Sequence, residues 1–121
     1  MAAPNLVNVS TITAKSVQGA LTTTLTTEFL ANAAASGKVY KVNNISVANI
    51  DGTNAADASV FITKSGGSPI AIASTISVPA DSSLVIVDKN TSIYLEEGDN
   101  IEAGASADSD LVITINYEEL S

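Results

Sequence analysis

The fold is decided by residues 58–76, ASVFITKSGGSPIAIASTI. Ala58, Val60 and Ile62 alternate with the residues between them, and the same alternation continues through residues 70–76. A period of two is typical of a β-strand that buries one face. Residues 65–69, SGGSP, predict a hairpin loop because glycine and proline favour tight turns. The stretch therefore predicts two antiparallel strands whose aliphatic side chains fill the space between two sheets.

The same period recurs on both sides of this hairpin. It predicts strands at residues 5–14 and at the threonine-rich residues 21–27, because β-branched side chains suit a pleated surface. Residues 39–50 form the longest candidate, and a change of phase at Asn43-Asn44 predicts a β-bulge there. The apolar run LVIV, residues 84–87, predicts a short strand covered on both faces. Shorter strands are predicted at residues 93–95, 101–105 and 111–117.

One window departs from this pattern. Residues 29–36, FLANAAAS, have a helix-compatible composition, with a loop or a single turn as an equal alternative. The remaining segments give eight or nine strands separated by turns every ~8–12 residues. The sequence thus predicts an all-β antiparallel sandwich, jelly-roll or immunoglobulin-like, as a single domain over residues 1–121.

Composition limits the chemistry. The chain contains no His, Cys, Trp or Arg. His and Cys most often move protons or attack electrophiles, and Arg most often clamps anions. We therefore expect no enzymatic activity, no catalytic, cofactor-binding or metal-binding residues, and no cofactor. Aromatic residues make up only 4%, so the core must consist of Val, Ile, Leu and Ala. Such a core predicts a thin domain, or one that a partner completes.

Charge limits the partners. The net charge is −8 with five lysines, whereas nucleic-acid binding needs a basic stripe and anionic membranes attract basic segments. We expect neither nucleic acid nor a membrane as a partner. The first residues lack the basic and long apolar regions of a secretory signal, which predicts synthesis in the cytoplasm.

Two acidic turns could supply a pair of catalytic carboxyl groups. Glu96, Glu97 and Asp99 lie in one turn, and Asp108 and Asp110 lie in another. A glycosidase needs two carboxyl groups across a cleft, one of them desolvated enough to stay protonated. Nothing in these turns predicts an apolar surface that would desolvate a carboxyl group. We therefore predict that these acids are solvated.

Two further motifs could bind a ligand or carry chemistry. Asp51, Asn54 and Asp57, or the 108/110 pair, offer hard oxygen ligands for calcium, but the full calcium-loop pattern is absent, and exposed turn residues are the favoured interpretation. Lys64 precedes SGGS, which superficially resembles a Ser/Lys pair or a phosphate loop. The spacing matches neither motif, so a hairpin loop is favoured.

Several segments carry a likeness to a known family. They are MAAPN at residues 1–5, VANIDGTNAA at 47–56, the region 78–101 and YEELS at 117–121. The region 78–101 contains VPA, then LVIVDKN, then IYLEEGD and Ile101. Together these segments resemble a group of small virion structural proteins of marine tailed bacteriophages, especially cyanophages. The resemblance implies a component of the phage particle, and it carries no functional residues because no catalytic motif is attached to the family.

The resemblance and the residues together predict a non-enzymatic virion structural protein. We expect a capsid decoration or cement protein on the head surface, located in the virion and made in the host cytoplasm. Its expected partners are further copies of itself, in a symmetric homo-oligomer such as a trimer, and other virion proteins such as the major capsid protein. Residues 5–9 and 118–121 are predicted to be arms that reach these neighbours.

Two alternatives remain open. The first is a neck, tail or fibre component of the virion, which copy number per particle would distinguish from a head protein. The second is a carbohydrate- or receptor-binding adhesin module in which Tyr40, Tyr94 and Tyr117 stack against sugars. Tyr40 and Tyr117 lie on apolar strand faces, so they are predicted to belong to the core.

Overall fold

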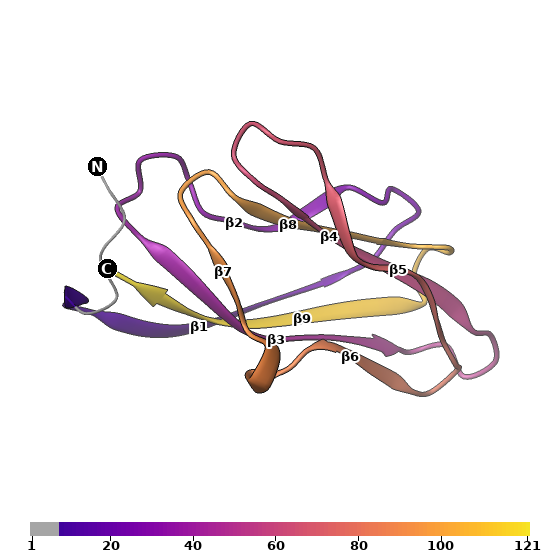
Figure 1. Cartoon of the computed structure of the whole chain (residues 1–121). Helices are drawn as coiled ribbons and strands as arrows, with labels where there is room; N and C mark the ends of the chain where they lie inside the picture. Colours follow the sequence, from indigo (N-terminus) through magenta and orange to yellow (C-terminus); the bar gives the residue numbers. More distant parts are fainter. Residues whose placement is uncertain (1–7) are drawn as a thin grey trace.

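A computed structural model describes residues 8–121 and shows two antiparallel sheets packed face to face (Figure 1). Sheet A has the strand order β1-β9-β3-β6, with β7 also pairing with β3, and sheet B has the order β2-β8-β4-β5. Among the described residues no helix is long and apolar enough to cross a membrane. The strands are β1 (Ile12–Ala20), β2 (Thr27–Ala31), β3 (Val39–Asn49), β4 (Ala56–Thr63), β5 (Ile70–Val78), β6 (Ser83–Val87), β7 (Ile93–Leu95), β8 (Asn100–Ala105) and β9 (Leu111–Leu120).

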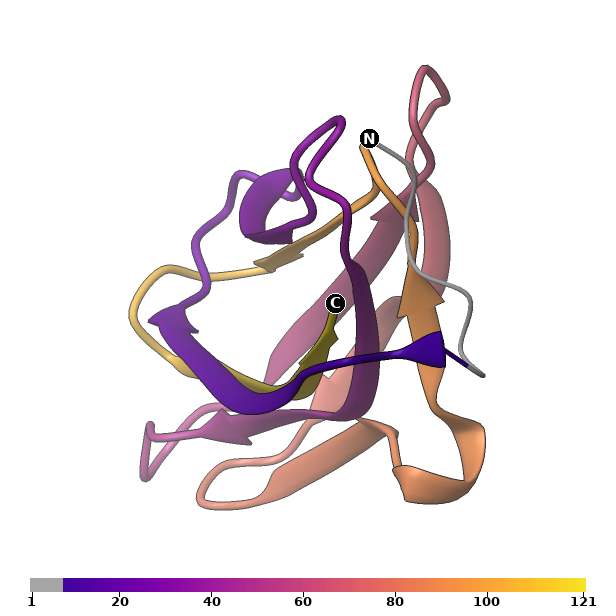
Figure 2. The same cartoon turned by 90° about the vertical axis from the view of Figure 1, so that its left-hand side faces the viewer.

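The strand order identifies the sandwich as a jelly roll. Apart from the short β7, each sheet has four strands, and the chain crosses repeatedly between the sheets, as two interlocked Greek keys require. The prediction of an all-β antiparallel sandwich is confirmed. Figure 2 shows the two layers from one end, where the first strand and the last strand lie next to each other.

β3 organises sheet A because it pairs with β9, β6 and β7. Its pairing with β9 shifts register between Val42 and Asn44, so the predicted bulge at Asn43-Asn44 is confirmed. The extra residue lets both Val42 and Ile45 face the core although three positions separate them, and both are fully buried. The shift in the alternation of apolar residues thus corresponds to a β-bulge in the strand.

The beginning of the chain differs from the prediction. β1 starts at Ile12, so residues 9–11 of the predicted first strand are irregular, and residues 5–7 lie outside the described part of the chain. The predicted threonine-rich strand at residues 21–27 is wrong, because residues 21–26 form a loop that crosses from sheet A to sheet B. The strand lies instead at β2, so the helix-compatible window has no helix. Phe29 of β2 packs across Gly19, and this tertiary contact outweighs local propensity.

The end of the chain is not an arm. Residues 118–120 belong to β9, which lies between β1 and β3, and Leu120 is buried. The Ser121 carbonyl accepts the N–H groups of Ser10 and Thr11 at 2.8 and 2.9 Å. The predicted C-terminal arm is therefore wrong, because these residues satisfy their backbone groups within the sheet.

The core consists of small aliphatic side chains, as the composition predicts. Its largest fully buried members come from both sheets and from the loop after β1: Leu21, Ile45, Leu95, Ile101, Leu111, Ile113 and Ile115. Two edge strands depart from the predicted burial. The predicted core side chains Ile70, Ile72 and Ile76 of β5 are exposed, and Val85 of β6, predicted to be covered on both faces, is 56% exposed.

Candidate functional site

An open strip of apolar side chains lies between β5 and β6, the edge strands that end sheet B and sheet A on the same side of the sandwich. Ile76 pairs with the buried Ala58, and Leu84 pairs with the buried Val47, so both side chains point toward the interior side of their sheets. They are incompletely covered because no further strand of residues 8–121 lies beyond them. We call this strip the apolar seam; it consists of Ile70, Ile76, Leu84 and Ile86.

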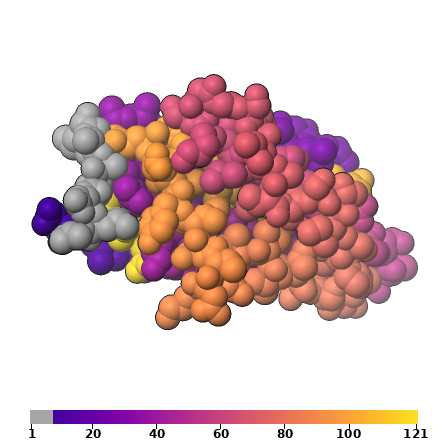
Figure 3. Space-filling view, in the orientation of Figure 1, coloured from indigo at the N-terminus to yellow at the C-terminus, as the bar shows by residue number. Residues whose placement is uncertain are grey.

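β5 and β6 lie side by side on one face of the molecule, as the salmon-to-orange surface turned toward the viewer in Figure 3. In β5, Ile70 is 64% exposed and Ile76 is exposed by more than a third. A run of apolar side chains on one strip marks a surface for protein contact more often than single exposed residues do.

On the opposite side of the sandwich, β1 and β2 are the edge strands. The Phe29 ring lies so close to Gly19 that a Cβ atom would approach it to 2.6 Å. Leu21, in the loop that joins these strands, is completely buried. These contacts fill one end of this side, whereas most of β1 is exposed.

The seam also differs from its surroundings in charge. β5 and β6 contain no Asp, Glu or Lys, although the chain carries eighteen such residues. Charges begin just outside the strands, at Lys64 before β5, Asp81 between the strands and Asp88 after β6. The backbone of β5 is irregular, because Thr75 has a φ of 52° and the pairing with β4 shifts register at two places. Such bulges make it harder for a further strand to pair with the edge through backbone hydrogen bonds. A partner would therefore contact the seam mainly through side chains.

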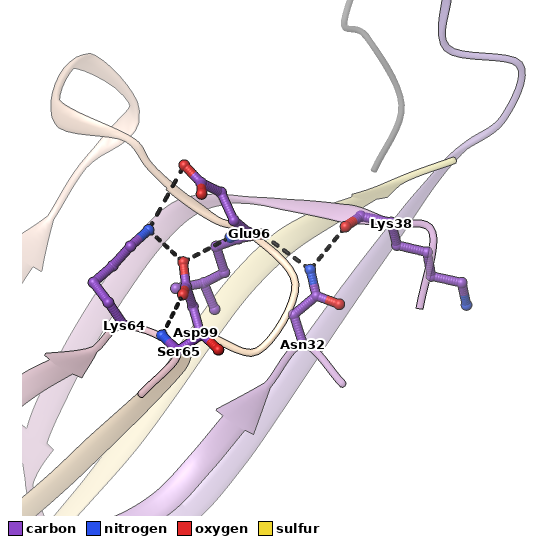
Figure 4. A network of polar contacts seen from close by, with 7 residues as sticks. Asn32, Lys38, Lys64, Ser65, Glu96 and Asp99 are labelled. Carbon is purple, nitrogen blue, oxygen red and sulfur yellow. Dashed lines mark hydrogen bonds and ion pairs between the residues drawn. The ribbon is translucent and has the colours of Figure 1, made fainter. Parts of the chain in front are cut away.

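A polar network ties three loops together at one end of the sandwich (Figure 4). Asp99 is only 2% exposed, and its carboxylate accepts the N–H of Ser65 at 3.0 Å, the N–H of Glu96 at 2.9 Å and the ammonium of Lys64. Burial raises the pKa of Asp99, but the Lys64 ammonium and the two backbone donors outweigh it, so the net pKa is lowered. The prediction of a solvated acid is therefore wrong for Asp99.

The other acids of this turn have different roles. The Glu96 side chain is exposed, as predicted, and lies 3.7 Å from the Lys64 ammonium. The carboxylate of Glu97 accepts the N–H of Gly37 at 2.9 Å, so this residue also holds a loop. The hydrogen bond with Asp99 raises the pKa of Lys64. The residues 64–68 form the predicted hairpin loop, but the sequence did not reveal that its lysine reaches Asp99.

Two buried asparagines hold loops in the same manner. Asn32 donates to the carbonyls of Lys38 and Leu95 at 2.8 and 3.1 Å. At the other end of the sandwich, Asn49 donates to the carbonyls of Asn54 and Val78, both at 2.9 Å. Buried amides that satisfy backbone groups fix the loops that carry those groups. These polar side chains stabilise the loops, because their hydrogen-bonding groups are bonded to backbone groups of those loops.

The calcium candidates do not converge. The Asp51 carboxylate accepts the N–H groups of Thr53 and Asn54 at 2.8 and 3.2 Å, and these bonds lower its pKa. The structure brings Asp51 close to Asp110, whose pKa is raised first by desolvation and then by the charge of Asp51. Asp108 instead accepts the N–H of Thr23 at 2.9 Å. Within residues 8–121, no three acidic side chains are grouped so that they could hold a metal ion.

The tyrosines separate into two environments. The rings of Tyr40 and Tyr117 lie 5.1 Å apart at an angle of 37° and pack against the core, as predicted. Tyr94 is 43% exposed and borders a hollow of about 270 Å³. The hollow is lined by Val9, Ile12, Lys41, Tyr94, Glu118 and Leu120.

No protein-family model matches the chain, and no curated protein matches it. The seam could have been suspected from the lack of charge in residues 70–78 and 83–87. Nothing in the sequence distinguishes Asp99 from the exposed acids beside it.

Proposed function

We propose that this protein is a non-enzymatic structural component of a tailed-phage virion, most specifically a decoration or cement protein on the head surface. The single observation that carries the proposal is the apolar seam, an uncharged surface suited to protein contact on an otherwise acidic chain. The sequence resemblance to small virion proteins points to the same class.

The architecture supports this proposal in two ways. Jelly rolls recur among viral capsid and lectin domains, although this support is an analogy of fold. In addition, the loops at both ends are held by buried side chains, namely Asn32 and Asp99 at one end and Asn49 at the other. A decoration protein has to keep its shape without disulfides, and this chain has no cysteine. Its partners in this proposal are further copies in a symmetric oligomer such as a trimer, and virion proteins such as the major capsid protein.

Counting the chain in purified virions tests the proposal. For a decoration protein we expect hundreds of copies per particle, and a map of the intact particle should show them on the head. Three, six or twelve copies would instead place the protein in the neck, the tail or a fibre. Absence of the chain from purified, infectious virions would contradict any structural role in the particle.

A second candidate function, glycan binding, is favoured by one observation. Tyr94 exposes part of its ring at the edge of a hollow whose lining includes Lys41 and Glu118, a combination of an aromatic surface and polar groups that sugar sites use.

Tyr94→Ala separates this candidate from the first. If the hollow binds sugar, a glycan array should give signals for the wild type that fall about 5-fold or more in the variant, because ring stacking contributes on the order of 1 kcal/mol or more. Tyr94→Phe keeps the ring and should retain most of the signal. An array on which the wild type binds nothing, or binding that Tyr94→Ala leaves intact, would argue against this candidate.

A further inference from the structure

We propose that the outer face of sheet A carries a groove that binds a neutral oligosaccharide chain lying across β7, β3, β9 and β1. This inference rests on the second candidate function, glycan binding, and adds the extent of the site and the class of glycan. The groove joins the hollow beside Tyr94 to a second hollow of about 450 Å³, and Glu118 lines both. The second hollow is also lined by Ala14, Ser16, Asn43 and Asn116.

The register of sheet A places the groove across the strands. Lys41 of β3 is paired with Tyr94 of β7 and with Glu118 of β9. Glu118 is in turn paired with Ala14 of β1, so the four side chains form a row on one face of the sheet. Val42, the next residue after Lys41, is fully buried, so this row faces away from the core. Neighbouring strands lie about 4.8 Å apart, so the row spans about 14 Å, enough for about three sugar units.

The β-bulge of β3 supplies amide groups beside this row. Two successive residues, Asn43 and Asn44, face outward there, because the residues on both sides of the pair are buried. The Asn43 amide donates to the Glu118 carboxylate at 3.1 Å, and the Asn116 amide donates to the Asn44 side-chain oxygen at 3.3 Å. Each amide has further donor and acceptor positions besides these bonds. The bulge thus gathers three asparagines at the second hollow, a use of bulges that is common next to binding sites.

The chemistry of the groove favours a neutral ligand that carries many hydroxyl groups. Amide groups both donate and accept hydrogen bonds, as sugar hydroxyls do, and the half-exposed ring of Tyr94 offers a flat surface to the C–H face of a sugar. Lys41 and Glu118 lie opposite each other, so their charges offset within the row. An acidic glycan would be repelled by a chain of net charge −8, whereas a neutral glycan would not.

A peptide fits this groove less well than a sugar chain. Peptides that add to a sheet need a free strand edge, but β3 and β9 each have neighbouring strands on both sides. The groove therefore offers mainly side chains across these strands. A peptide would leave much of its backbone without hydrogen-bond partners, whereas sugar hydroxyls can rotate toward the side chains that are present.

NMR titration of the full-length chain tests the inference with β-1,4-linked oligomers of glucose and of N-acetylglucosamine, from two to six units. We expect the affinity to rise about 5-fold with each unit up to about four units and then to level off, because each unit in the groove adds about one net contact. Asn116→Ala changes an exposed residue at the end of the groove far from Tyr94. It should weaken binding of the hexamer about 5-fold or more and leave binding of the disaccharide within about 2-fold.

Asn90→Ala is the matched control. It removes the same side chain from an exposed position in the turn after β6, outside the lining of both hollows, and should leave the affinity for every oligomer unchanged. Equal weakening by Asn90→Ala and Asn116→Ala would overturn the groove.

The other outcomes separate the groove from glycan binding as such. Affinity that does not increase beyond the disaccharide, or hexamer binding that Asn116→Ala leaves intact, would overturn the groove and leave the hollow beside Tyr94 as a glycan site. Tighter binding of galacturonic acid oligomers of equal length would overturn the neutral class of ligand. If neither neutral series shifts the resonances at about 10 mM, the groove is overturned, whereas the glycan array still decides the second candidate function.

Discussion

Replacement of Gly104 by alanine is expected to destabilise the fold by about 3 kcal/mol or more, because the site has no room for a methyl group. Gly104 is the last residue but one of β8, and the loop of residues 21–26 crosses directly over it. A Cβ atom at this position would lie 2.4 Å from Leu25 Cα and 2.8 Å from the Thr24 carbonyl oxygen. Both obstacles belong to the backbone, so relief requires the whole loop to move. That movement would strain the bond of 2.8 Å from the Ala105 N–H to the Thr22 carbonyl.

Gly52→Ala provides the matched control. A Cβ atom at Gly52 would meet only the Asp81 carboxylate, at 3.6 and 3.8 Å, which is ordinary contact. We expect this variant to stay within about 0.5 kcal/mol of the wild type. Urea unfolding gives the free energies, and in a thermal scan Gly104→Ala should lower Tm by roughly 10–15 °C. Equal stability of the two variants would show that the loop does not pack on β8 as described.

Replacement of Asp99 by alanine is expected to cost about 3 kcal/mol of unfolding free energy. The change removes the acceptor for two backbone N–H groups, those of Ser65 and Glu96, and leaves them without a partner at a buried site. It also deprives Lys64 of its closest anion, although the lysine side chain is half exposed and can return to water. Most of the loss should therefore come from the backbone donors.

Glu96→Gln is the control in the same loop. Glu96 lies near the same ammonium group, but its side chain is 72% exposed, so its removal should change stability by less than about 1 kcal/mol. Urea unfolding at pH 7 compares the two variants with the wild type. A loss in Asp99→Ala no larger than that in Glu96→Gln would refute the role of Asp99 in fixing these loops.

The contribution of Asp99 also has a defined direction with pH. Its pKa is lowered in the folded protein, so the ionised carboxylate stabilises the fold above the unfolded-state pKa of about 3.9. That stability is lost as the pH falls through the lowered native pKa. The pKa of Glu119 is also lowered, by hydrogen bonds from Lys38 and Lys15, so Glu119 too contributes stability that is lost at acid pH. The stability difference between the wild type and Asp99→Asn, which should narrow below about pH 4, isolates Asp99 from Glu119.

The elements that could be predicted from the sequence are those in which local pattern and tertiary packing agree. In β3 the apolar residues change phase, and the structure has a bulge at the same asparagines. The turn at residues 65–69 and the final strand followed from glycine, proline and strict alternation. β3 and β9 each have a neighbouring strand on both sides, and these neighbours require the burial that the pattern indicates.

The errors arose where packing overrode the pattern. The threonines of residues 22–26 favour a strand, but the loop must pass over Gly104, which the local sequence does not indicate. In β5 the isoleucines alternate correctly, and the position of the strand at an edge leaves them exposed. Position within a sheet is a property of the whole topology, so a single strand cannot reveal it. The burial of Asp99 could not be predicted for the same reason, because its partners Lys64 and Ser65 are more than thirty residues away in the sequence.

The placement of β9 has a consequence for how the chain is made. β9 pairs with β1 on one side and β3 on the other, so residues 111–120 hold together two strands that are synthesised long before them. Until β9 pairs, β1 has no neighbour in its sheet among the described residues, and β3 lacks one of its neighbours. Folding is therefore expected to be slow, since its central pairings join distant parts of the chain. During that interval the unpaired edges of β1 and β3 make the chain most prone to aggregation.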